Sequence, residues 1–349
     1  MKNVFKKKSV IICLIVFIIG VPVMSLLLVH NMYGRNFGRV DAPAYTGWLQ
    51  YDDLEGYDRE EVQFESGDNK LTGYIYGAEN TRGLVVIAHG LGGGAENYMA
   101  ETVYFADAGW KVFAYDCTGS YNSEGDSTKG LSQSVLDLDA ALTYVEAQNW
   151  DLPVMLYGHS WGGYAVTAVL NYDHDVTAAV SLSGYATPTE LLDEQAEQIF
   201  GWLSKVMYPF EILYQKILFG DAAGLSAIEG INKDDTPVMV IHGTEDSSIQ
   251  YDGASIIAHK DEITNPNVVY ITRNEEGRDG HSTLYRSETA IEYMNEVNEA
   301  YNELNTEYDG EIPDEEKERI YAGVDKFQTS ELDVELMDQI NQFFEDSLK

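Results

Sequence analysis

Short apolar runs that alternate with helical segments are the feature of this sequence that most constrains its fold. Helical periodicity at residues 95–108 and 135–147 lies between such runs. Almost continuously apolar runs are typical of parallel strands that are covered on both faces. The alternation predicts an α/β fold with a mostly parallel, doubly wound sheet. The runs lie at residues 84–88, 111–115, 154–157, 177–182, 238–241 and 268–271.

Two other segments extend this pattern. Residues 62–65 and 71–76 alternate apolar and polar side chains, which predicts an antiparallel hairpin at the start of the domain. Residues 187–235 are too long for one crossover and are rich in aromatic and aliphatic side chains. We expect a helical cap over the carboxyl ends of the strands here, and a two-helix crossover packed as core is the alternative.

An acidic C-terminal extension follows at residues 291–349, which hold 18 acidic and 4 basic side chains. Its stretch 311–318 is expected to be a solvated loop. A last amphipathic helix is expected to dock on the sheet. Its apolar face would carry Leu336, Ile340, Phe343 and Phe344.

The segment Gly158–Gly163 reads G-H-S-W-G-G and directly follows the run at 154–157. A sharp strand-to-helix turn of this kind exposes its serine, here Ser160, and its glycines let the backbone pass closely. The N-terminus of the following helix would favour a developing negative charge. Ser160 is therefore a candidate nucleophile, and a glycine-bounded turn with an idle serine is the alternative.

With two glycine-rich loops, this turn makes the sequence resemble the α/β-hydrolase superfamily, especially its serine aminopeptidase-like and monoacylglycerol lipase-like members. The resemblance covers about residues 60–290. The loop H-G-L-G-G at 89–93 resembles the family's oxyanion loop, which implies that the backbone N–H groups of Leu91 and Trp161 form the oxyanion hole. In the loop at 116–125, Thr118 and Tyr121 replace the family's usual arginine and glycine.

A serine hydroxyl needs a base to take its proton, and the sequence has seven histidines. His281, in G-R-D-G-H-S, follows the last apolar run, where the chain order serine, acid, histidine requires the base. Asp246, in H-G-T-E-D after the run 238–241, matches the family's G-x-x-D and would orient the imidazole. The alternative for His281 is an exposed loop histidine without a catalytic role. The alternative for Asp246 is the neighbouring Glu245.

The N-terminus carries an apolar run at residues 10–29, preceded by Lys6, Lys7 and Lys8. A helix of this length spans about 30 Å of hydrocarbon, so residues 1–30 are expected to be a signal anchor with the rest of the chain outside the cell membrane. A signal peptide cleaved near Val23–Ser25, giving a secreted protein, is the alternative. Residues 31–60 are expected to be a juxtamembrane spacer, and residues 61–349 the catalytic domain.

The net charge of −36 argues against nucleic acid as a partner. Cys13 and Cys117, the two cysteines, lack the spaced partners of a zinc site, and we expect no cofactor or metal. The sequence therefore predicts a membrane-anchored serine hydrolase for lipid-like or other acyl esters. A serine aminopeptidase-like enzyme acting on short peptides and a non-catalytic surface binding module remain as alternatives.

Overall fold

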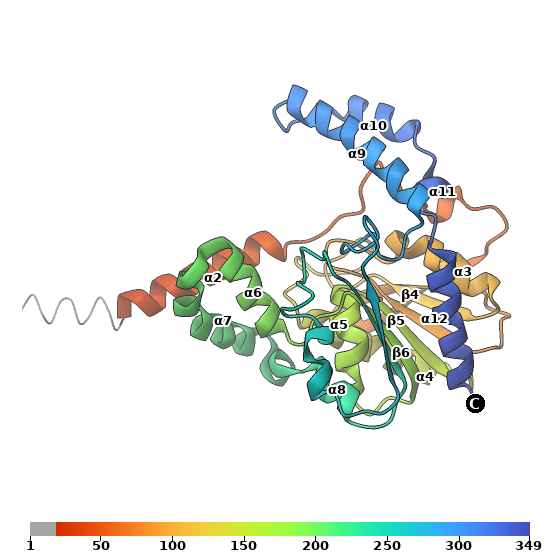
Figure 1. Cartoon of the computed structure of the whole chain (residues 1–349), viewed down its shortest axis with the longest axis horizontal. Helices are drawn as coiled ribbons and strands as arrows, with labels where there is room; N and C mark the ends of the chain where they lie inside the picture. The colour runs from red at the N-terminus through yellow and green to blue at the C-terminus, as the bar shows by residue number, and fades with distance from the viewer. Residues whose placement is uncertain (1–18) are drawn as a thin grey trace, which may run out of the picture.

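One eight-stranded mixed sheet forms the centre of the computed structural model, which describes residues 19–349. Its strand order is β1-β2-β4-β3-β5-β6-β7-β8 (Figure 1). β1 and β2 form an antiparallel hairpin, β2 pairs antiparallel with β4, and all other pairs are parallel. The strands are β1 Arg59–Ser66, β2 Asn69–Tyr76, β3 Leu84–Ala88, β4 Lys111–Tyr115, β5 Val154–His159, β6 Val176–Leu182, β7 Val238–Gly243 and β8 Val268–Arg273.

The last strand differs from its prediction. Each predicted apolar run is a strand, and β3 and β4 are buried along their whole length. β8, however, lies at the sheet edge, where Val269 and Tyr270 are exposed. The expectation of cover on both faces is wrong for this strand, because an apolar run does not reveal whether its strand has one neighbour or two.

Helices cover both faces of the sheet, and a hydrophobic core lies between the sheet and the helices on each face. Successive residues of a strand point into these two cores in turn. Val86 of β3 belongs to the core beneath α4 Gln133–Ala147, α5 Trp161–Ala168 and α8 Ala227–Asn232. Val85 and Ile87 belong to the opposite core, beneath α3 Met99–Asp107 and α12 Val334–Ser347. Short 3₁₀ segments connect these elements: η3 Ala95–Tyr98, η4 Val169–Asn171 and η7 Ile256–Glu262.

The insertion between β6 and β7 is helical. It contains α6 Pro188–Phe200, η5 Gly201–Leu203, α7 Ser204–Phe219 and η6 Gly220–Gly224. We call α6, η5 and α7 the cap. Thr187 caps α6 by accepting a hydrogen bond from the N–H of Glu190, and Pro188 follows at the first helical position.

An N-terminal helix, α2 Val21–Asn36, packs against the cap (Figure 1). The rings of Tyr33 and Tyr214 lie 4.8 Å apart, and Val29 is buried. The predicted spanning run at 10–29 lies partly outside the described residues. Within residues 19–349, no helix has the length and apolar character needed to span a bilayer.

The segment after α2 is bound to the domain and is not a free spacer. Phe37 and Leu49 are buried, and residues 51–53 form η2 Tyr51–Asp53. The Arg39 guanidinium donates hydrogen bonds to backbone carbonyls of the loop at 116–125, on Tyr121, Ser123 and Gly125. These three charge-assisted hydrogen bonds fix the segment after α2 to the domain.

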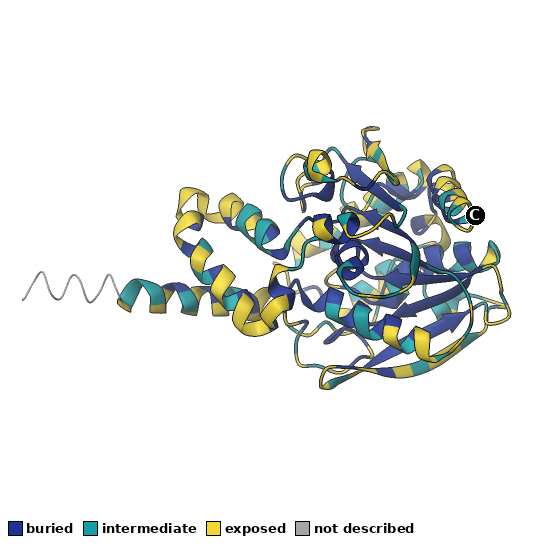
Figure 2. Cartoon of the chain, turned by 90° about the horizontal axis from the view of Figure 1, so that it is seen from below, coloured by how far each residue is buried: buried dark blue, intermediate teal, exposed yellow. Residues whose placement is uncertain are grey.

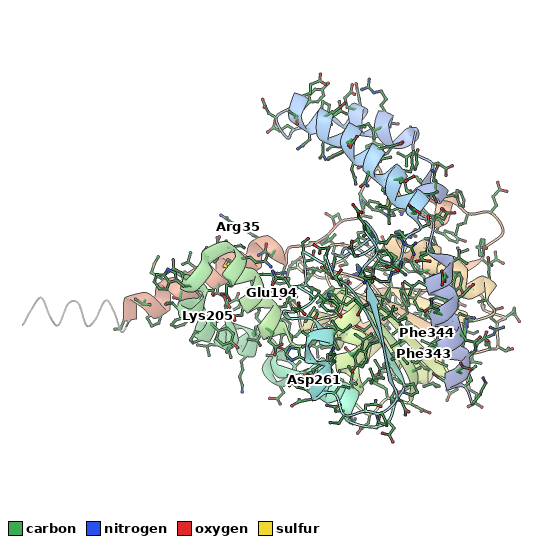
Figure 3. The ribbon with its side chains drawn as sticks, viewed as in Figure 1. Arg35, Glu194, Lys205, Asp261, Phe343 and Phe344 are labelled. Atoms are coloured by element: carbon green, nitrogen blue, oxygen red, sulfur yellow. The ribbon has the colours of Figure 1, made fainter. Side chains whose placement is uncertain are left out.

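The C-terminal extension forms α9 Glu288–Glu307, α10 Asp314–Ala322, α11 Lys326–Thr329 and α12. We call α9 and α10 the arm, which projects from the body in Figure 1. The expectation of a loop at 311–318 is wrong for its second half, because three acids at 314–316 favour the N-terminus of α10. In α12, Leu336, Ile340 and Phe344 are fully buried on the sheet side (Figure 3).

Candidate active site

Ser160 lies in the turn between β5 and α5 with φ +59° and ψ −115°, a conformation that is strained for a residue with a Cβ atom. Its N–H donates to the carbonyl of Leu182, and its own carbonyl accepts from Tyr164, so the turn is held from both sides. Glycine is needed nearby, because a Cβ atom at Gly162 would collide with the carbonyl oxygen of Ala88.

Ser160, His281 and Asp246 lie in hydrogen-bond contact, although more than 80 residues separate the serine from the other two along the chain. His281 Nε2 is 2.8 Å from Ser160 Oγ, and its Nδ1 is 2.8 Å from Asp246 Oδ2. This geometry lets the serine hydroxyl donate to the imidazole while the imidazole donates to the carboxylate. Glu245, the alternative acid, is exposed, whereas the side chain of Asp246 is fully buried.

The surroundings of Asp246 keep its carboxylate charged. Its Oδ1 accepts hydrogen bonds from the backbone N–H groups of Ser248 and Ile249, each at 2.9 Å. His242 Nε2 lies 3.3 Å from Oδ2 and 2.9 Å from the carbonyl of Ile249. Burial raises the pKa of Asp246, but the contacts with His242 and His281 outweigh it and leave the pKa well below its usual range.

The two predicted oxyanion donors both lie near Ser160. Trp161 is the first residue of α5, and Leu91 lies in the loop after β3 and lines the cavities next to Ser160. Within the part of the chain that the structure describes, neither backbone N–H donates to a protein acceptor. Both remain available to an oxygen bound next to Ser160.

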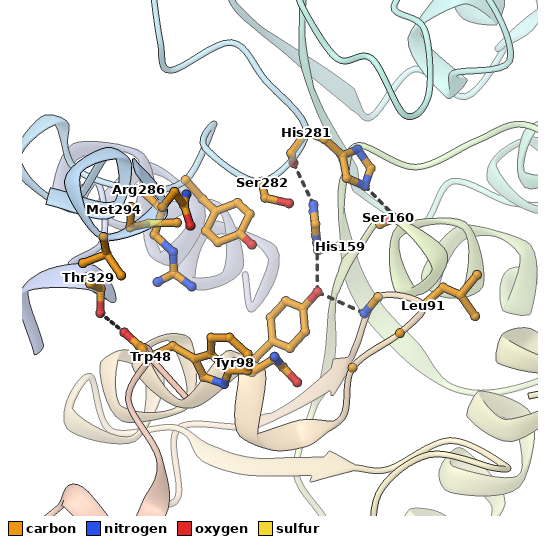
Figure 4. A pocket seen from close by; sticks show the side chains of 18 of the residues that line it. Trp48, Leu91, Tyr98, His159, Ser160, His281, Ser282, Arg286, Met294 and Thr329 are labelled. Atoms are coloured by element: carbon orange, nitrogen blue, oxygen red, sulfur yellow. Dashed lines mark hydrogen bonds between the residues drawn. The ribbon is translucent and has the colours of Figure 1, made fainter. Parts of the chain in front are cut away.

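A hydrogen-bonded chain that the sequence did not reveal connects the oxyanion loop to the base (Figure 4). The N–H of Gly90 donates to the Tyr98 hydroxyl, which lies 2.8 Å from His159 Nδ1. His159 Nε2 lies 2.8 Å from the backbone carbonyl of His281. Burial and the neighbouring His281 lower the pKa of His159 to about 3, so its neutral ring accepts from Tyr98 and donates to His281.

The other histidines have partners outside this chain of contacts. His89 accepts from the N–H of Cys117, and burial lowers its pKa to about 4. The remaining three lie near carboxylates or tyrosine: His30 with Tyr214, His174 with Asp139 and Glu146, and His259 with Glu190 and Glu262.

The loop at 116–125 is anchored without the family's arginine. Asp137 of α4 accepts hydrogen bonds from both the N–H and the hydroxyl of Thr118. Tyr121, with φ +41°, is buried and donates its hydroxyl to Asn97. It therefore packs inside the loop.

A family model described as "Serine aminopeptidase, S33" matches residues 79–221. The chain has the α/β-hydrolase fold, and this part of it is similar to that family. The match includes Leu91, Ser160 and the cap and ends before Asp246 and His281. No curated protein matches the sequence significantly.

Solved structures show the same fold at low sequence identity. An esterase from Pyrococcus furiosus is 19% identical with a TM-score of 0.53, over 71% of this chain and 92% of that one. A second crystal form of this esterase is 18% identical, also with a TM-score of 0.53, over 77% and 99%. At such identity the similarity establishes the α/β-hydrolase fold alone.

Two cavities meet at Ser160, the predicted nucleophile. Both cavities have more apolar than polar lining, and the cap-side cavity, of about 400 Å³, extends from Ser160 between α2, α6 and α7. The arm-side cavity, of about 390 Å³, contains more polar side chains, including Asn97, Asn298 and Arg286, and extends toward α9 (Figure 4). The cap-side lining includes Val29, Met32, Tyr33, Leu131, Leu191, Ala196, Ile199, Glu211 and Ile249.

One ionisable side chain stands out in the cap-side cavity. Glu211 of α7 is 3% exposed, and its Oε2 is buried with no hydrogen-bond partner among the described residues. Burial, with a smaller contribution from Asp193, raises the pKa of Glu211 to about 7. As for metals, residues 19–349 contain no group of three or more His, Cys, Asp or Glu side chains placed to hold an ion.

Proposed function

We propose that the chain is a serine hydrolase that cleaves carboxylic esters through an acyl-enzyme on Ser160. The observation that carries this proposal is the pair of 2.8 Å contacts from His281 to Ser160 and to Asp246, at the point where two cavities meet. The arrangement provides a nucleophile, a base and an orienting acid together.

In the proposed reaction, Ser160 Oγ attacks the ester carbonyl carbon and His281 Nε2 takes the hydroxyl proton. The carbonyl oxygen becomes an oxyanion, which the N–H groups of Leu91 and Trp161 stabilise; one such donor contributes about 3 kcal/mol to lowering the barrier. His281 then protonates the departing alcohol. Water, activated by the same imidazole, releases the acid and restores Ser160.

We assign the acyl chain to the cap-side cavity and the leaving alcohol to the arm-side cavity. Val29, Leu191 and Ile249 offer the former an aliphatic wall, which favours a hydrocarbon chain. The polar groups of the arm-side cavity suit an alcohol or glycerol-like group that forms hydrogen bonds.

Labelling by a fluorophosphonate probe tests the nucleophile in the full chain. We expect covalent labelling that is lost in Ser160→Ala and kept in Ser282→Ala, since Ser282 is a second serine at the same site and is exposed. The absence of labelling in folded protein would instead favour the non-catalytic binding module.

A peptidase is the second candidate, and Glu211 is the observation that favours it. A carboxylate in the cavity beside Ser160 would pair with the amino-terminal ammonium of a short peptide. Comparison of kcat/KM on p-nitrophenyl esters and on aminoacyl amides separates the two. We expect the esters to be preferred. A preference for amides that Glu211→Gln removes, while the matched variant Gln195→Glu keeps it, would reverse the assignment.

We also propose that residues 1–30 anchor the enzyme in the cell membrane with residues 31–349 outside. The apolar run at 10–29 and the three lysines before it support this orientation. External protease should degrade the domain in intact cells, and carbonate washing should leave the chain in the membrane fraction. Release of a shortened chain into the medium would favour signal-peptide cleavage.

A further inference from the structure

Most of the exposed large hydrophobic side chains of residues 19–349 lie on α2 and the cap. These helices form one end of the molecule, where many residues are exposed (Figure 2). The most exposed of them is Trp202 of η5, at 75%. We call this set the apolar rim. It consists of Val23, Met24, Leu27 and Leu28 of α2 together with Trp202, Leu203, Val206, Leu213 and Ile217 of η5 and α7.

The rim belongs to one packed unit. α2 and α7 are in contact through the rings of Tyr33 and Tyr214, and the His30 ring is hydrogen-bonded to the Tyr214 hydroxyl. α7 buries Met207 and Phe219 inward and still exposes Val206 and Ile217 outward. The inner side of α7 packs against the protein, and its outer apolar side indicates a second apolar neighbour.

The neighbour that fits is a lipid bilayer. Residues 10–19, which precede α2 in the sequence, are all apolar, and Lys6, Lys7 and Lys8 precede them. The rim lies at the end of the molecule where α2 begins (Figure 1). An exposed tryptophan beside aliphatic side chains is typical of the membrane–water interface.

Charge indicates how the contact forms. Residues 41–349 hold 16 basic and 58 acidic side chains, so anionic lipid repels the body. Contact must then come from apolar burial, which salt does not screen.

The cap-side cavity lies directly behind the rim. Its wall includes Val29, Met32 and Tyr33 of α2 and Ile199 at the end of α6, and it reaches Ser160. Ile199 is 69% exposed, so it lies both in the cavity wall and on the outer surface beside the rim. A hydrocarbon chain leaving a bilayer at the rim would meet apolar side chains along its way to Ser160.

We propose that the apolar rim lies in the surface of a zwitterionic lipid bilayer, so that the cap-side cavity opens toward the membrane and receives the acyl chain of a lipid ester from it. The contact with lipid stands by itself, whereas the delivery of an acyl chain rests on the proposed ester hydrolysis.

Quenching of tryptophan fluorescence tests the contact without catalysis. The full chain is reconstituted in vesicles of phosphatidylcholine that carries bromine on its acyl chains. We expect quenching that Trp202→Phe largely removes and Trp150→Phe leaves in place, because Trp150 lies before the amino-terminal end of β5, whereas Ser160 follows its carboxyl end. Equal quenching in wild type and Trp202→Phe would overturn the proposal, since the N-terminal run alone would then account for binding.

A pair of double variants tests delivery. Trp202→Asp with Ile217→Asp removes apolar side chains from the rim; Phe327→Asp with Val334→Asp removes side chains of similar exposure, 57% and 59%, from α11 and α12. We expect the rim variant to hydrolyse a long-chain ester in vesicles about tenfold more slowly while soluble butanoate hydrolysis is unchanged. The second variant should match wild type on both.

The remaining outcomes are distinguishable. Equal loss on both substrates, or no loss in vesicles, contradicts delivery. Trp202-dependent quenching without any ester hydrolysis keeps the lipid contact and refutes the proposed function. If the rim instead joins two copies of the chain, cross-linking gives a dimer that the rim variant abolishes, and bromolipid does not quench Trp202; that result overturns the proposal.

Discussion

The cap and the arm both contribute a wall to a cavity that ends at Ser160, yet the outer surface of α7 in the cap and that of the arm have opposite chemistry. α7 carries a single acid, Glu211, which is buried, and its outer surface is largely apolar. Residues 288–322, which contain α9 and α10, hold 12 acidic and 2 basic side chains, and their outer surface is solvated. The outer faces of α7 and the arm therefore differ more than the linings of their cavities do, and this difference is the basis for proposing lipid as the neighbour of α7 alone.

The largest expected effect comes from the group of Ser160, His281 and Asp246, where the cap-side and arm-side cavities meet. Asp246→Asn should lower kcat by about 10³–10⁴-fold, because an amide no longer stabilises the imidazolium form of His281. The loss should be equal for substrates with large acyl groups and with large alcohols. Glu245→Gln, one residue away and exposed, should keep wild-type kcat. A loss confined to one substrate class would mean that the cavities do not share this centre.

Filling each cavity should separate the two sides. Ala196→Trp narrows the cap-side cavity, and we expect kcat/KM for a decanoyl ester to fall about 10–100-fold relative to a butanoyl ester. Val297→Trp narrows the arm-side cavity and should penalise bulky alcohols at constant acyl length. The reverse pattern would exchange the assignments of acyl chain and alcohol.

A smaller effect is expected from the chain of contacts on the arm side. Tyr98→Phe removes the hydroxyl that accepts from Gly90 and contacts His159, so the base loop loses one support. We expect kcat to fall about tenfold with little change in KM, as about 1 kcal/mol of positioning is lost. Tyr121→Phe, whose hydroxyl contacts Asn97 instead, serves as the control. Equal kcat in both variants would show that the contact is merely structural.

The smallest expected effect is on the free energy of unfolding and comes from Glu211, the one acid of α7. The folded state raises the pKa of Glu211 to about 7, so the unfolded chain loses this proton first as pH rises. Stability therefore falls from about pH 4.5 to pH 7, and the penalty is full above that range. Glu211→Gln should raise the unfolding free energy at pH 8 by roughly 1–3 kcal/mol and change little at pH 4. Glu299→Gln on α9, an exposed acid, should change neither value in denaturant titrations.

Strands and the order of site residues could be predicted because both follow local rules. The apolar runs at 84–88 and 111–115 coincide with β3 and β4, and the contacts of Ser160 with His281 lie where the chain order placed them. The catalytic role of those residues stays a prediction until labelling is measured.

The parts that sequence reasoning missed depend on contacts between distant segments. The role of His159 needs Tyr98 and the carbonyl of His281, and the wall that α2 gives the cap-side cavity needs a helix more than 120 residues before Ser160. The exposed edge of β8 depends on how many neighbours the strand has. No local pattern carries such information.

The left-handed backbone at Ser160 also bears on how this protein would respond to selection. Glycine adopts φ +59° without Cβ strain. The variant Ser160→Gly should therefore have a free energy of unfolding about 1 kcal/mol higher than wild type, and it should lose the proposed hydrolytic activity. Laboratory evolution that selects for thermal stability alone would therefore favour loss of the Ser160 side chain. A selection for more stable variants has to include an activity measurement in each round.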